Sequence, residues 1–64
     1  MNTDKPTVRL LGQDGNIYNL MVIARRALRE ANMDEQVVSM IEEVENSDSY
    51  NQALSIIGKY VEIE

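Results

Sequence analysis

The side chains best suited to binding chemistry gather on one predicted helix, which spans roughly residues 17–31. Four of them follow one another at spacings of four, three and four residues, with one more arginine beside them: Tyr18, Val22, Arg25 and Arg29, then Arg26. Residues at such spacings share one face of an α-helix. Tyrosine and arginine around an apolar residue are typical of protein-binding hot spots, so this face is predicted to contact a protein partner or a second copy of the chain.

A structural role explains the same pattern equally well. The small sheet predicted below could cover Val22 or its neighbour Ile23, and the arginines could be solvated or paired with Glu30 and with the second helix. A central helix that is packed on two sides would show the same surplus of apolar residues. The sequence leaves these two interpretations open.

The same three arginines also form a small basic patch, which makes a nucleic-acid accessory role the main alternative. The net charge of −5 and the acidic second helix argue against nucleic-acid binding.

A further alternative is an acidic inhibitor, in which carboxylates of the second helix and the segment after it mimic phosphates for a basic target. The acids concerned are Glu42, Glu43, Glu45 and Asp48. A solvated helix face explains these carboxylates better.

Catalytic chemistry has little support in this composition. The chain contains no histidine and no cysteine, so it lacks the usual base for an activated serine, the common zinc ligands and any disulfide. The four serines are interpreted as helix caps or polar surface residues: Ser39, Ser47, Ser49 and Ser55. We therefore predict no catalytic residue, no metal, no cofactor and no enzyme activity.

A glycine-containing loop precedes the predicted binding helix and could be mistaken for a phosphate site. The segment Gly12–Asn16 reads Gly-Gln-Asp-Gly-Asn, without the lysine and serine or threonine of a P-loop and with Asp14 where an anion would be repelled. Glycines suit a turn with positive φ, and Asn16 can cap the helix. The segment is predicted to be a structural turn.

The elements around this helix predict an α+β fold in the order β-α-α-α-β. Val8–Leu11 is predicted to be a strand, and the alternation of Val61, Glu62, Ile63 and Glu64 predicts a second strand. Because isolated strands are marginal, Val8–Leu11 is expected to pair with Val61–Ile63 and to pack on three short helices. Whether the strands run parallel or antiparallel is not encoded in their pattern.

Apolar stripes and capping residues place the three helices. The first stripe contains Ile17, Leu20, Met21, Ala24, Ala27, Leu28 and Ala31; the second contains Val37, Met40, Ile41 and Val44; the third contains Tyr50, Ala53, Leu54 and Ile57. Asn32 with Glu35, or Asp34 alone, is predicted to cap the second helix, and Ser49 with Gln52 the third.

Length and composition bear on the number of domains, the distribution of charge and the cellular location. Sixty-four residues predict one small domain over residues 8–64 behind a flexible N-terminal arm of residues 1–7. Five of the six basic side chains lie in residues 1–29, and nine of the eleven acids lie in residues 30–64, which suggests complementary halves or a basic binding face. No apolar run is long enough for a membrane span and no secretory signal is evident, so a cytoplasmic protein is expected.

The motif pattern resembles a family of short, functionally uncharacterised bacterial and phage-associated proteins. The matching residues are Gly12, Asp14, Gly15 and Asn16; Arg25, Arg26, Ala27 and Leu28; Ser47, Asp48, Tyr50 and Leu54; and Val61 and Ile63. Ser49 departs from the Gly-Asp-Tyr run of that pattern. The resemblance implies a bacterial source, which includes phages and other mobile elements, and a small non-enzymatic domain. Together with the Tyr18–Arg29 face, it predicts a small acidic protein-interaction module.

Overall fold

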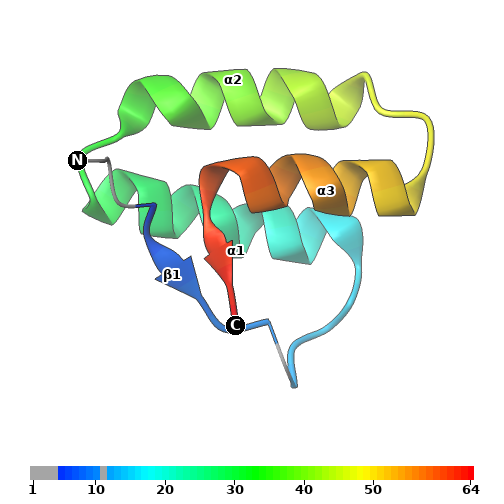
Figure 1. Ribbon diagram of the computed structural model, residues 1–64, viewed down its shortest axis with the longest axis horizontal. Helices are drawn as coiled ribbons and strands as arrows, with labels where there is room; N and C mark the ends of the chain where they lie inside the picture. Colours follow the sequence, from blue (N-terminus) through cyan, green and yellow to red (C-terminus); the bar gives the residue numbers. More distant parts are fainter. Residues whose placement is uncertain (1–4, 11) are drawn as a thin grey trace.

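Three helices and two short strands follow one another in the computed structural model, which describes residues 5–10 and 12–64 (Figure 1). The elements are β1 (Thr7–Val8), α1 (Ile17–Glu30), α2 (Asp34–Glu45), α3 (Tyr50–Tyr60) and β2 (Glu62–Ile63). The predicted α+β fold and its β-α-α-α-β order are confirmed. Residues 1–4 of the predicted arm and Leu11 of the predicted first strand lie outside the described residues.

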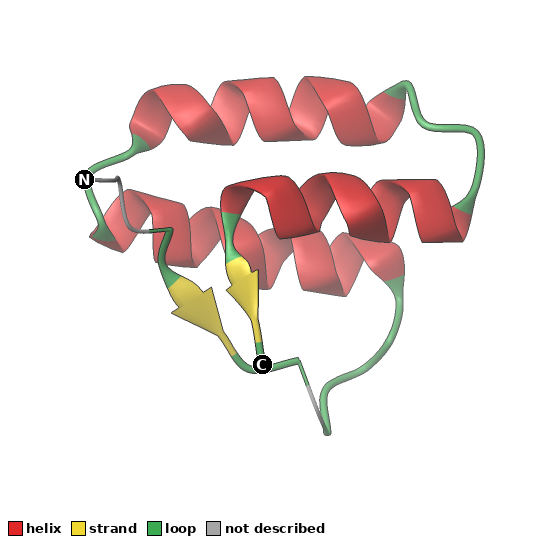
Figure 2. Ribbon diagram, in the orientation of Figure 1, coloured by secondary structure: helices red, strands yellow, loops and turns green. Residues whose placement is uncertain are grey.

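The helices form two antiparallel hairpins, so that α1 and α3 run in the same direction and the two strands lie side by side below them (Figure 2). None of the helices in residues 5–10 and 12–64 is long and apolar enough to cross a membrane.

The two strands pair in parallel, with Thr7 opposite Glu62 and Val8 opposite Ile63. Parallel pairing needs a crossover connection, which the three helices supply. The first strand begins at Thr7, one residue before its predicted start, and its ladder continues past Val8 because the Leu10 N–H donates to the Glu64 carbonyl at 3.3 Å. Residue 7 of the predicted arm is therefore part of the sheet.

One apolar core joins β1 and the three helices and includes Val61, directly before β2. Its fully buried large side chains are Leu28 of α1, Met40 of α2, Ile57 of α3 and Val61 just before β2. Ala24 is also completely buried, and its small side chain lets neighbouring elements approach α1 closely. Two residues of the predicted stripes, Ala31 and Tyr50, are exposed instead.

Polar side chains cap α1 and α3 as predicted. The Asn16 Oδ1 atom accepts a hydrogen bond from the Tyr18 N–H at 2.9 Å, and the Ser49 Oγ atom accepts one from the Gln52 N–H at 3.1 Å. The reciprocal bond of the second cap is displaced by one residue, because the Gln52 Oε1 atom accepts from the N–H of Asp48 and not of Ser49. The loop before α1 needs a glycine at Gly12, where φ is +85°.

The predicted caps of α2 are wrong, because Asn32 ends α1 instead of starting α2. Its φ is +62°, and α2 begins at Asp34 behind Met33 without a side-chain cap. The Met33 N–H donates to the Leu28 carbonyl at 2.8 Å, and the Asn32 N–H donates to the Arg29 carbonyl at 3.0 Å. This is a Schellman motif with asparagine in the left-handed position, and Met33 packs against the core beside it.

The left-handed backbone of Asn32 predicts a clear order of stability among variants. Asn32→Gly should raise the free energy of unfolding, because glycine adopts positive φ without a steric cost. Asn32→Ala should lower it by about 1 kcal/mol, since a Cβ without a polar group strains this conformation. Urea unfolding followed by circular dichroism measures the order Gly, Asn, Ala. An alanine variant as stable as the native chain would contradict the assignment.

Candidate functional site

The outward side of α1 carries the five residues predicted to bind a partner. The opposite side of this helix is buried through Leu20, Ala24 and Leu28. Tyr18 is 69% exposed and Val22 is 40% exposed, so both side chains lie on the surface and not in the core. We call the five residues the α1 face: Tyr18, Val22, Arg25, Arg26 and Arg29.

The positive charges of the α1 face are not neutralised by ion pairs within the part of the chain that the structure describes. There, the salt bridge joins Lys59 to Glu43, on α3 and α2. Arg26 and Arg29 are exposed, and Arg25 is half-buried. Among the described residues, these arginines therefore form no salt bridge with Glu30 or with the second helix.

Val22 and Ile23 have different environments. Ile23 is half-buried and packs against the core, whereas Val22 stays exposed. β1 contacts α1, so the sheet accounts for part of the apolar surplus of this helix. It does not account for Val22, which leaves an apolar side chain among three arginines on the surface.

Two open clefts border the α1 face and divide its residues. The first, the tyrosine cleft, has a volume of about 600 Å³ and is lined by Tyr18 together with Tyr50, Asp48 and Glu45. The second, the edge groove, has a volume of about 410 Å³ and lies between β1 and α1. Its lining includes Thr7, Val8, Arg9, Val22, Ile23 and Arg26. Arg25 and Arg29 line neither cleft, so the structure does not bring the predicted residues into one pocket.

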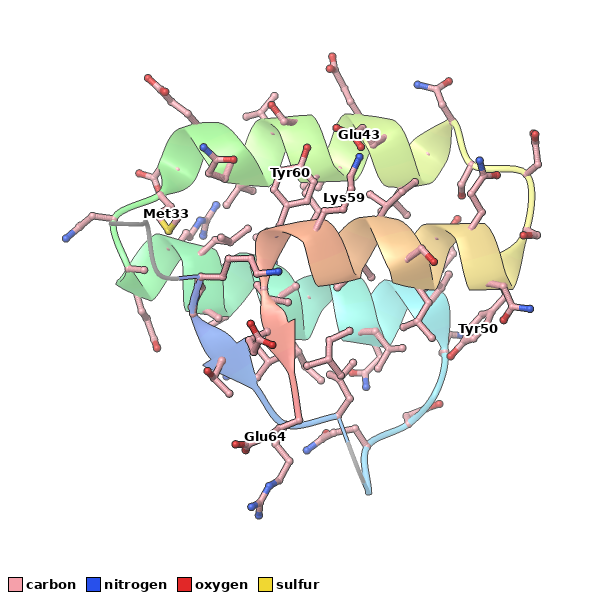
Figure 3. All side chains as sticks on the ribbon, in the orientation of Figure 1. Met33, Glu43, Tyr50, Lys59, Tyr60 and Glu64 are labelled. Carbon is pink, nitrogen blue, oxygen red and sulfur yellow. The ribbon has the colours of Figure 1, made fainter. Side chains whose placement is uncertain are left out.

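Tyr50 is a site residue that the sequence assigned to the core. It is 48% exposed, and its hydroxyl donates a hydrogen bond to the Gly15 carbonyl at 2.7 Å (Figure 3). This bond ties the first turn of α3 to the loop before α1. The available signal was its place directly after the Ser49 cap, where a tyrosine can keep its polar end at the surface.

Arg9 is a second site residue that sequence reasoning did not single out. It follows β1 directly, is exposed, and lines the edge groove opposite α1. Alternation along a strand gave the only available signal, because Val8 is buried and its neighbours must then point outward.

The acidic side of α2 includes one carboxylate that is already engaged. The Glu43 Oε1 atom lies 2.8 Å from the Lys59 ammonium, and its Oε2 atom accepts a hydrogen bond from the Tyr60 hydroxyl at 2.5 Å (Figure 3). Hydrogen bonds from Lys59 and then from Tyr60 lower the pKa of Glu43 below its usual value, and the bond to Glu43 raises the pKa of Tyr60. Glu42, Glu45 and Asp48 are exposed.

No three of the acids that the structure describes come together in a way that could hold a metal ion. The N-terminal end of α1 is likewise engaged by its own loop: Asp14 Oδ1 accepts from the Asn16 N–H at 3.0 Å, and Asn16 caps the helix. The arrangement offers surfaces for contact, built from an exposed tyrosine, arginines and an apolar side chain.

Comparisons with known proteins give no further guide to the site, because no family model, no curated protein and no solved structure matches this chain.

The engaged carboxylate predicts a pH dependence of stability. Because the pKa of Glu43 is lowered in the folded chain, its contribution is fully present above the unfolded pKa, near 4.5, and is lost as the pH falls through the lower folded value. Glu43→Gln should therefore lose less stability than the native chain when the pH is lowered from 6 towards 3. The control is Glu42→Gln, which removes an exposed charge from the same helix. Parallel acid limbs for the native chain and Glu43→Gln would contradict the prediction.

The Tyr50 hydroxyl predicts a local effect on the loop before α1. Tyr50→Phe should cost about 0.5–1 kcal/mol of unfolding free energy, since it leaves a partly exposed carbonyl to water. Backbone amide exchange should accelerate around Gly15 and Asn16 and stay unchanged in α2. Uniform acceleration across all three helices would show a global effect and contradict the local one.

Proposed function

We propose that this chain is a small non-enzymatic protein-interaction module and that the α1 face is its contact surface. The observation that carries the proposal is the exposure of Tyr18 at 69% and Val22 at 40% beside arginines. Tyrosine and arginine are enriched among the residues that contribute most to binding in protein interfaces, since each combines apolar area with directional hydrogen bonds. Burying such a patch gains free energy without any rearrangement of the core.

The guanidinium groups add specificity to this proposal. Within the described residues they are not engaged in salt bridges, so a partner can pair with them without first breaking an internal bond. They favour a partner with carboxylates around an apolar centre. A second copy of the chain meets part of this description through its acidic α2, which makes self-association the simplest form of the proposal.

Nucleic-acid binding remains the second candidate, because the same three arginines could contact phosphates. The net charge of −5 opposes it, since the remaining surface would repel a polyanion. The acidic-inhibitor alternative has less support, because Glu43 is paired with Lys59 and Tyr60. With the resemblance to bacterial and phage-associated proteins, the proposal extends to a cytoplasmic setting in a bacterium.

The experiment compares two double variants with the same change of net charge. Arg25→Gln with Arg29→Gln alters the α1 face outside both clefts, and Asn51→Glu with Ser55→Glu alters exposed positions of α3. Each chain is immobilised and exposed to nuclease-treated bacterial lysate, and its self-association is measured by analytical ultracentrifugation. The arginine variant should lose a captured protein or shift the dimer equilibrium about tenfold, whereas the α3 variant should not.

Two outcomes oppose this proposal. Capture that disappears with nuclease, or that falls steeply with salt on an immobilised oligonucleotide, would support the nucleic-acid candidate. Equal behaviour of the native chain and the arginine variant in both measurements would remove the α1 face as a contact surface.

A further inference from the structure

On one edge of the parallel ladder, the backbone groups have no hydrogen-bond partner among residues 5–10 and 12–64. The hydrogen bonds along the other edge of β1 include Glu62 N–H to the Pro6 carbonyl at 2.8 Å, Glu64 N–H to the Val8 carbonyl at 2.8 Å, and Leu10 N–H to the Glu64 carbonyl at 3.3 Å. Backbone groups of successive strand residues point to alternate edges. The N–H and C=O groups of Thr7 and Arg9 therefore point away from β2.

The edge groove lies beside those groups. Figure 1 shows no helix or strand beyond β1 on the side away from β2 among the described residues. The groove is lined on one side by Thr7, Val8 and Arg9 and on the other by α1, where Val22 and Ile23 give it an apolar wall. Main-chain groups without a partner in the described part of the chain, next to an apolar wall, are what an added strand requires.

Charge selects the kind of strand. Arg9 and Arg26 lie on the two walls, and the lining by described residues includes one acid, Glu30. These arginines favour an acidic strand. The strand that pairs with the other edge of β1 is also acidic, since Glu62 and Glu64 flank Ile63 there. A second copy joined through its own β1 would bring another Arg9 and Arg26 to the same edge, and these like charges would oppose each other.

We infer that the edge groove binds an extended segment of a partner protein as a third strand, and that this segment alternates apolar and acidic residues. Its main chain bonds to the outward groups of Thr7 and Arg9. Its apolar side chains contact Val22 and Ile23, and its carboxylates pair with Arg9 and Arg26. The inference rests on the proposed interaction function. It specifies the kind of partner that binds at the edge groove, which borders the α1 face.

The test uses a synthetic peptide whose pattern copies residues 61–64, with blocked ends and the sequence Val-Glu-Ile-Glu-Val-Glu. It is titrated into the ¹⁵N-labelled full chain. The chemical shifts of the Thr7 and Arg9 amides should change in a saturable way, and these amides should exchange more slowly with solvent. The chemical shifts of α2 should stay unchanged. A peptide with lysine in place of glutamate should bind at least tenfold more weakly.

Main-chain pairing is separated from charge attraction by a change in the peptide alone. N-methylation of alternate residues, in either of the two phases, removes donors from one edge of the peptide. One of the two methylated peptides should lose binding and the other should keep it. Equal binding of both would overturn the added-strand inference, and this control does not depend on the folding of any variant.

Two arginine pairs distinguish this inference from the proposed function. Arg9→Gln with Arg26→Gln should weaken peptide binding about tenfold, whereas Arg25→Gln with Arg29→Gln should leave it within about twofold. If no peptide binds but the second pair still abolishes partner capture or dimerisation, the edge groove is not a strand site and the proposed function stands. If the peptide binds as expected and the second pair has no effect on capture, the α1 face as proposed is wrong and the groove is the interface.

Discussion

Burial of Val8 and Val61 is the interaction on which the rest of this fold depends. The two paired strands are two residues each, too short to be stable through hydrogen bonds alone. Val61 is fully buried and Val8 is 5% exposed, so the apolar core holds the two ends of the described chain together below the helices. The ladder joins two segments that the core holds side by side. The open edge of β1 and the groove beside it follow from this arrangement.

Periodic apolar residues made most of the fold predictable. The stripe through Leu20, Ala24 and Leu28 is the buried side of α1, and the caps at Asn16 and Ser49 form as their residue types indicate. Asn32 was assigned to the wrong helix because its side chain can accept at a helix start and its backbone can also adopt positive φ at a helix end. Only the three-dimensional path decides between these roles. Tyr50 was misplaced for a related reason, since spacing predicts a face but not how far the first turn extends beyond the core.

The α1 face was identifiable in the sequence, whereas the edge groove was not. Spacing alone places Tyr18, Val22 and Arg29 on one side of a helix. The groove needs information that no local pattern contains: the parallel direction of β2, the register of Thr7 with Glu62, and therefore which main-chain groups of β1 remain outside the ladder. Arg9 gains its place in the site only through that register. The long-range pairing of the two strands depends on the burial of Val8 and Val61 in the core, which no local pattern contains.

The parallel strands also give the chain a mechanical character. Because β1 and β2 run in the same direction, a force that pulls residues 5 and 64 apart acts along the strands and in opposite directions on them. The hydrogen bonds donated by Glu62 and Glu64 would then be stretched together, in shear, and not opened one after another. Antiparallel pairing of the same two segments would unzip from one end. The short ladder thus resists tension through the chain better than its length suggests.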